Sequence, residues 1–351
     1  MKLHFIDRYD ALVKTLLFGD SEFKQNLYLN SAGTASIGFN FDLQNDATVD
    51  RVLEAINFDP LGKLLDGEAY VAEHYYIGLL KSAFYHSRSA DLESLNTVIE
   101  SILDARRCDN RYRAYPQFMR FEQFKFPDNE KGLALCYILT KQYEKMVDDW
   151  LTSFGFDILK HNSHLLSRNS QERAVLVSLA SQNIIGFDEF GSQRAIPLAN
   201  TFIDNNRSEA WYQIRYGLSM KSKQDSTSIK RQYFESEIFG LYDEGVNAAN
   251  IDREHCKQLY AMYNLYKEHI LFFERNYNYL IVQANEEFKF GAQRVKTLEQ
   301  SFSIAYNHVR NLPRQSSLIE SYINTMEEDM SDLVDTWSRD DDLDHEIAIA
   351  S

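Results

Sequence analysis

The residue types best suited to acid–base chemistry lie near the start of the chain. Glu22 directly follows an amphipathic segment, and Asn30 and Ser36 stand six residues apart on the two arms of a predicted hairpin. Hydrolysis of a glycosidic bond needs one acid that protonates the leaving oxygen and a second group, on the other face of the sugar, that acts as base or nucleophile. A carboxyl at a helix end and a polar hairpin across a cleft could supply both groups, and the apolar Phe23 could raise the pKa of Glu22.

The spacing alone leaves alternatives open for this segment. Glu22 also fits a solvated surface residue, which is what a glutamate after a helix usually is. Asp20, two residues earlier, is a rival for the acid.

A short helix and a hairpin must position these residues. Apolar residues recur at helical spacing from Ile6 to Leu17, which predicts an amphipathic helix that ends near Gly19. From Leu27 to Phe41, apolar and small residues alternate around a Ser-Ala-Gly turn signal. This alternation predicts a β-hairpin, the only convincing sheet in the sequence.

The rest of the chain is predicted to be helical. Helical periodicity runs from Val49 to about Leu151, with loops at 59–62 and 111–130, and two or three long helices are expected after Asp252. Between them lie four shorter helical segments, at 173–182, 194–205, 209–216 and 226–242. One hairpin among many helices predicts an α+β, mostly helical fold.

Four segments carry a family resemblance, in the order that the family has them. Glu22 is followed by Tyr28-Leu29-Asn30-Ser31-Ala32-Gly33 and Ser36-Ile37-Gly38-Phe39, and further along come the segments Arg173 to Gln182, Asn206 to Gly217 and Arg231 to Phe239. The first resembles the catalytic segment of phage-type lysozymes, in which a Glu precedes a Tyr-x-Asp-x-x-Gly-x-x-Thr-Ile-Gly-x-Gly hairpin. The others resemble the central buried helix, a segment frequent in pesticin-like muramidases, and the closing helix. Together they span about residues 5 to 243.

The resemblance implies a lysozyme-like fold with a small β-hairpin lobe, a helical lobe and a helical C-terminal appendage. It also implies a muramidase that hydrolyses the β-1,4 bond between N-acetylmuramic acid and N-acetylglucosamine with inversion, without a metal or organic cofactor. By the same resemblance Glu22 is the general acid, and Asn30 and Ser36 hold the attacking water. Gln182 contacts N-acetyl groups, Arg231 pairs with Glu22 or holds the cleft closed, and Tyr28 joins the substrate-binding residues.

The hairpin departs from the family at one important position. The family has an Asp where this chain has Asn30, and a neutral amide orients a water but does not accept its proton. Three outcomes stay open: reduced activity, a base supplied by another carboxylate such as Asp20 or Asp42, or a domain that binds glycan without cleaving it. Ser36 keeps the hydroxyl of the family's Thr, so its change is mild.

The expected domain organisation has two parts. Residues 1–244 form the lysozyme-like domain with a helical insertion at about 61–154, and residues 245–351 form a helical region that ends in an acidic tail. The insertion could enlarge the upper lobe, cover the cleft or bind an immunity partner. Within the first part, Arg207 and Arg215 are expected to form structural ion pairs, and Trp211 and Tyr212 to pack between helices.

Charge and cysteine content exclude several function classes. With 37 Lys and Arg against 52 Asp and Glu, the net charge is −15, which argues against nucleic-acid binding. Three cysteines without CxxC spacing favour buried or partly buried thiols in a reducing cytoplasm, and His161 and His164 lack a third metal ligand. A charged N-terminus and the lack of a long apolar run predict a protein made in the cytoplasm without a signal peptide and without membrane insertion.

The expected partners and setting follow from these points and the resemblance. The glycan strand of peptidoglycan is the expected substrate, and an immunity protein and a secretion component are the expected protein partners. The favoured setting is an antibacterial effector that acts in the periplasm or at the cell wall of a target bacterium. A phage endolysin and a catalytically inactive lysozyme-like binding domain are the alternatives.

Overall fold

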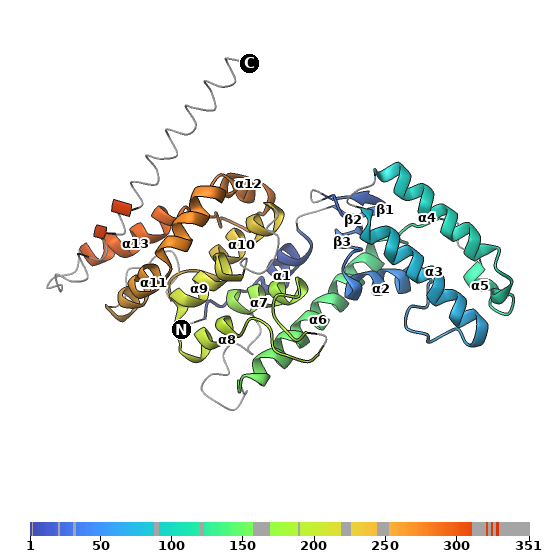
Figure 1. Ribbon diagram of the computed structural model, residues 1–351, viewed down its shortest axis with the longest axis horizontal. Coiled ribbons are helices and arrows are strands. Elements are labelled where there is room, and N and C mark those ends of the chain that lie inside the picture. The colour runs from blue at the N-terminus through green and yellow to red at the C-terminus, as the bar shows by residue number, and fades with distance from the viewer. Residues whose placement is uncertain are drawn as a thin grey trace, which may run out of the picture. The chain divides into compact units, whose positions relative to one another are not determined.

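The computed structural model is mainly helical, with a three-stranded antiparallel sheet near the N-terminus (Figure 1). The α+β fold class is therefore confirmed. The structure describes residues 1, 3–19, 22–30, 33–87, 91–119, 123–156, 169–188, 190–218, 226–243 and 253–310, together with residues 321, 324, 325, 328 and 329. Within these residues no helix combines the length and the apolar character needed to cross a membrane.

The chain divides into two compact units. One holds residues 1–16 and 143–351, and the other holds residues 17–142. They are called the helical unit and the sheet unit below. The predicted boundary at 244/245 lies at the edge of a segment outside the described residues and stays a prediction.

The sheet unit is built around β1 (Lys24–Leu29), β2 (Ala35–Gly38) and β3 (Phe41–Asp42), in that order. The predicted hairpin is confirmed, but the sequence did not predict β3 as a separate strand. One face of the sheet packs on a cluster of aromatic rings that contact one another edge-on or tilted: Phe18, Phe23, Phe39, Phe41 and Phe126. Such ring contacts give the small sheet a core of its own.

The remainder of the sheet unit is helical, as the insertion was predicted to be. It consists of α2 (Asp46–Ala55), α3 (Gly67–Tyr85), α4 (Leu92–Arg107), η2 (Asn110–Tyr112), α5 (Pro116–Met119) and the first part of α6 (Asn129–Ser153). η2 overlaps the start of the segment 111–130 and α5 lies inside it, so that segment is not the plain loop we expected. A buried ion pair joins α3 to α4, because Arg106 Nε donates to Glu73 Oε2 over 2.8 Å.

The helical unit is centred on α7 (Gln171–Ser181), in which every residue from 172 to 180 is buried. α7 packs against α10 (Ser226–Phe239), which contacts α9 (Arg207–Arg215), and α9 contacts α8 (Ile196–Ile203). α1 (Tyr9–Phe18) belongs to this unit as far as Leu16. All five helices overlap the segments predicted from the sequence. A helix that is buried all round is expected at the centre of such a bundle.

The C-terminal helices are α11 (Arg253–Tyr277), α12 (Leu280–Glu287) and α13 (Leu298–Arg310). A fully buried ion pair attaches α11 to α9, since Arg215 Nη2 lies 3.4 Å from Glu274 Oε1. Tyr216 donates to the same oxygen over 2.7 Å. The predicted acidic tail at 339–346 lies outside the described residues.

Candidate functional site

Asn30 and Ser36 lie side by side in the hairpin, as their spacing predicts. Asn30 Nδ2 donates to Ser36 Oγ over 3.2 Å, and Asn30 Oδ1 accepts from the Thr34 backbone N–H over 3.0 Å. The backbone N–H of Gly33 also donates to the carbonyl of Asn30. Both ends of the Asn30 amide therefore take part in the hairpin turn. Ser36 is fully buried, so its hydroxyl supports Asn30 and does not face solvent.

A row of polar side chains crosses the sheet at Ser36. Tyr28 of β1 and Asp42 of β3 are its Cα partners on either side. Residues directly opposite each other in an antiparallel sheet share a face, so all three point to the side away from Ile37 and Phe41. Asp42 is half-buried, and its Oδ1 accepts from the Gln44 backbone N–H over 2.9 Å. Asp42 thus gives this row a carboxyl group, whereas Asn30 in the turn contributes only an amide.

Tyr28 contributes a phenol to this row. Its hydroxyl donates to Asn40 Oδ1 over 3.2 Å, and burial raises the pKa of Tyr28 to about 12. Lys24 Nζ lies 4.1 Å from the centre of its ring. A phenol with this pKa stays protonated at neutral pH, so Tyr28 can donate or stack but does not act as a base.

Glu22 is exposed and lies two residues before β1 begins. The ring of Phe23 packs on Phe39 and Phe126, within the aromatic cluster. Among the described residues no hydrogen bond or ion pair engages its carboxylate. Glu22 is thus open to a ligand. Its rival Asp20 lies outside the described residues.

Gln182 and Arg231 meet in the helical unit, around a carboxyl that sequence reasoning did not single out. Glu235 is fully buried, and its Oε1 accepts from Ser178 Oγ at 2.5 Å, Gln182 Nε2 at 2.8 Å and Arg231 Nε at 3.2 Å. Burial raises the pKa of Glu235 in spite of the charge of Arg231 and these hydrogen bonds. The spacing of Arg231 and Glu235, four residues apart on one helix, is the signal that could have found this pair.

The other arginines and aromatic residues singled out in the sequence are structural. Arg207 binds Glu172 and Asp243, with both nitrogen–oxygen distances 2.7 Å. Trp211 and Tyr212 are only 2% and 1% exposed, which leaves no face for a sugar ring. The ion pairs and packing roles expected for these residues are therefore confirmed.

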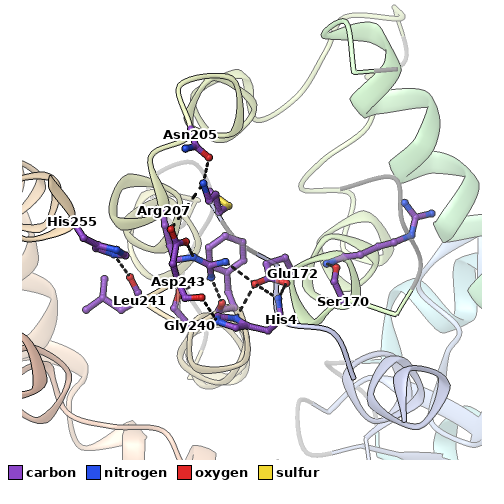
Figure 2. Close-up of polar contacts among 12 residues, drawn as sticks. His4, Ser170, Glu172, Asn205, Arg207, Gly240, Leu241, Asp243 and His255 are labelled. Atoms are coloured by element: carbon purple, nitrogen blue, oxygen red, sulfur yellow. Dashed lines mark hydrogen bonds and ion pairs between the residues drawn. The ribbon is translucent and has the colours of Figure 1, made fainter. Parts of the chain in front are cut away.

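Figure 2 shows the polar contacts that join the first residues of the chain to the helices of the same unit. They run through the side chains of Glu172 and Arg207. The carboxylate of Glu172 accepts from the backbone N–H of His4 at 3.0 Å, and lies 2.9 Å from His4 Nδ1. Arg207 Nη1 also donates to the carbonyls of Phe239 and Gly240. Burial alone would raise the pKa of Glu172, but the hydrogen bond from His4 and the charge of Arg207 hold it below its ordinary value of 4.5.

Among the described residues, the structure adds no candidate metal site and no candidate reactive thiol. Within the described ranges, no three His, Cys, Asp or Glu side chains come together as possible metal ligands. His161 and His164 lie outside those ranges. Cys136 and Cys256 are buried and form no disulfide, whereas Cys108 is exposed, contrary to the expectation of buried or partly buried thiols.

Comparisons of the chain with protein-family models, curated proteins and solved structures found no match. Two separate groups of polar residues are therefore defined by their own geometry. The sheet unit holds an exposed carboxylate, Glu22, and a polar row that includes Asp42. The helical unit holds Gln182 and Arg231, which both donate to Glu235. Two carboxyl groups on one small sheet are the groups that acid–base hydrolysis of a glycosidic bond requires.

Proposed function

We propose that the chain is a glycoside hydrolase of the muramidase type, which cleaves the β-1,4 bond between N-acetylmuramic acid and N-acetylglucosamine. The observation that carries the proposal is the pair of carboxyl groups on the sheet, Glu22 at the entry to β1 and Asp42 on β3 beside Ser36. The sequence resemblance to phage-type lysozymes supports the same chemistry, because it covers Glu22 and the hairpin.

Glu22 acts as the general acid in this proposal. It is exposed, so it can reach a leaving oxygen, and a carboxyl in its protonated form donates to that oxygen as the bond breaks.

Asp42 acts as the general base. Asn30 occupies the position of the family's Asp, but its amide is hydrogen-bonded to Thr34 and Ser36, and an amide does not accept a proton at ordinary pH. Asp42 lies in the same row and retains an ionisable carboxyl. Of the alternatives left open by the sequence, the register of β3 thus supports Asp42.

The proposal is tested by clearing of a suspension of purified peptidoglycan sacculi. Glu22→Gln keeps the size of the side chain and breaks no contact of the described residues, so we expect a folded variant with at least 100-fold slower clearing, the usual scale of an acid–base contribution. Glu68→Gln is the matched control, because Glu68 is an exposed glutamate of the same unit, and it should leave the rate unchanged. Equal rates for Glu22→Gln and wild type would show that Glu22 is not the acid.

A glycan-binding domain without turnover is the second candidate, and Asn30 in place of the usual Asp is the observation in its favour. Such a domain would pellet with sacculi and release nothing. The biological setting, an effector delivered to the periplasm of a rival cell with a cognate immunity protein, stays a prediction from the sequence.

A further inference from the structure

The outer face of α3 carries large apolar side chains and no charge. The inner face of this helix packs on α4 within the sheet unit. On the outer face Val71, Tyr75 and Tyr85 are 60%, 58% and 71% exposed. None of the exposed residues of α3 after Glu68 is charged. The solvent-facing side of a surface helix is normally polar, so the outer face of α3 has the composition of a face that becomes covered.

A glycine lies in the middle of this face. Gly78 is an exposed residue near the centre of a 19-residue helix, and a Cβ added there would meet no atom within 4 Å. Glycine in a helix interior destabilises the helix relative to alanine. Its backbone is not in the left-handed region, so neither the local conformation nor a neighbouring atom requires a glycine here. The missing side chain instead leaves room for a second helix to approach the backbone from outside.

The exposed residues of α3 form two neighbouring rows. Val71, Gly78 and Tyr85 follow one another at intervals of seven residues, and so do Tyr75 and Ser82. Residues seven apart lie on the same side of a helix, two turns from each other, and helices that pack along their length use this spacing. In each row a small residue lies next to a large one. The outer face therefore has the pattern of a helix-packing seam.

This seam is complementary to a second copy of itself. If two α3 helices cross antiparallel about a two-fold axis at Gly78, the two glycines meet at the closest approach. Val71 and Tyr85 each lie seven residues from Gly78, so Val71 of one copy faces Tyr85 of the other. Tyr75 then lies beside Ser82 of the other copy, whose small side chain leaves room for the ring. One patch that meets its own copy in this way is the arrangement of a two-fold dimer.

Charge favours a second copy as the occupant of this face. The net charge of the chain is −15, so two copies repel each other unless they meet where no acid is exposed. The outer face of α3 is such a surface. A cationic partner, in contrast, gains no ion pair from the exposed residues of α3 that follow Glu68.

The exposed area is consistent with a dimer of modest affinity. Tyr75 and Tyr85 together expose on the order of 250 Å². With Val71 and the smaller residues the face reaches roughly 500 Å² per copy, so a pair buries about 1,000 Å², the lower limit of a specific interface. We therefore expect a dissociation constant on the order of 10 μM.

We infer that the outer face of α3 is the interface of a homodimer in which two α3 helices cross antiparallel at Gly78. The inference goes beyond the proposed hydrolase and does not depend on it, because the face contains neither Glu22 nor Asp42.

The test is sedimentation velocity of the full chain from about 1 to 200 μM, a range that brackets the expected dissociation constant. We expect the mass to rise from one chain to two. Gly78→Gln should weaken the dimer about 10-fold or more, because the new side chain would separate the two backbones. The open space at Gly78 and the better helix propensity of glutamine should keep the single chain folded, with a melting temperature in dilute solution that is unchanged or higher.

Ser101→Gln is the matched control, because Ser101 is an exposed small residue of α4 in the same unit, and it should leave the dimer unchanged. Tyr85→Ser is a second interface variant that should also weaken the dimer. A chain that sediments as a monomer at every concentration, or a Gly78→Gln variant that dimerises like the wild type, would overturn the inference. A monomeric chain whose Tyr85→Ser variant pellets less with sacculi would overturn it as well, and would assign the face to glycan.

Discussion

Asp42 lies directly opposite Ser36 across β2 and β3, as its Cα partner in the sheet. The residue on the other side of Ser36 is Tyr28, and the hydroxyl of Ser36 also accepts a hydrogen bond from Asn30. The serine is thus the centre of a polar row in which Asp42 carries the carboxyl group. This relationship assigns the base of the proposed reaction to β3.

Asp42→Asn tests that assignment without disturbing the turn. The carbonyl oxygen of an asparagine can keep the hydrogen bond to the Gln44 backbone N–H, but it does not accept a proton. We expect clearing of sacculi to slow by about 100-fold or more with an unchanged melting temperature. Asp128→Asn is the control, because Asp128 accepts from a backbone N–H in the same unit in the same way. Full activity of Asp42→Asn would remove it from the reaction.

Asn30→Asp separates the two candidate bases. The new carboxylate can still accept from the Thr34 N–H, and Ser36 can rotate its hydroxyl to donate, so the hairpin should persist. If Asp42 is the base, the rate of clearing stays within about threefold of the wild type, too small a change to reflect the gain of an acid–base group. A large rise in rate would instead show that position 30 is the base position and that Asn30 limits this chain.

Gly38→Ala should destabilise the sheet unit by more than the cost of placing an alanine in the left-handed region, because the new methyl group would also meet a side chain. Gly38 has φ of +68°, and a Cβ there would lie 2.6 Å from the ring of Phe41. Gly33 has φ of +73° with nothing within 4 Å, so Gly33→Ala measures the backbone cost, about 1–2 kcal/mol. We expect the free energy of unfolding to fall by about 1–3 kcal/mol more for Gly38→Ala. Equal losses in urea titrations would place the Phe41 ring elsewhere.

Glu172→Gln should destabilise the helical unit in a pH-dependent way. The pKa of Glu172 lies below 4.5 in the folded chain, so its contribution to stability is fully present above pH 4.5. That contribution is lost as the pH falls through the folded pKa, because the unfolded chain then binds the proton more tightly. We expect a loss of about 3 kcal/mol at pH 7, typical of a broken buried ion pair.

The measurement for Glu172 is urea unfolding of the wild type and the variant at a series of pH values. The difference between them should narrow below pH 4.5. A constant difference from pH 7 to the acid limit of folding would mean that the ionised carboxylate of Glu172 does not hold His4 and Arg207.

The sequence predicted the elements better than the site. Helical periodicity located α1 and the helices of the helical unit, because apolar residues recur at helical spacing along them. It did not locate β3, since a strand of two residues has no detectable alternation. Without β3, the pairing of Ser36 with Asp42 was not predictable, and Asp42 stood only as one alternative to Asn30.

The contacts of Glu235 were also not predictable from the sequence, because they join residues that lie far apart along the chain. The sequence places Ser178 and Gln182 on one helix and Arg231 and Glu235 on another, but only the packing of α7 on α10 brings them together. Arg231 was expected to pair with Glu22 or to hold the cleft closed. The carboxyl it contacts in its own unit is Glu235. Burial of a charged residue depends on tertiary contacts, so residue type and spacing do not reveal it.

The central claim is tested most directly by the chemistry of the cut. Purified sacculi are digested with the wild type, and the released fragments are reduced and identified by mass spectrometry. The account predicts muropeptides whose new reducing ends are N-acetylmuramic acid, present with wild type and Glu68→Gln and absent with Glu22→Gln. Fragments that end in reducing N-acetylglucosamine, or a folded chain that pellets with sacculi and releases no fragment, would contradict it.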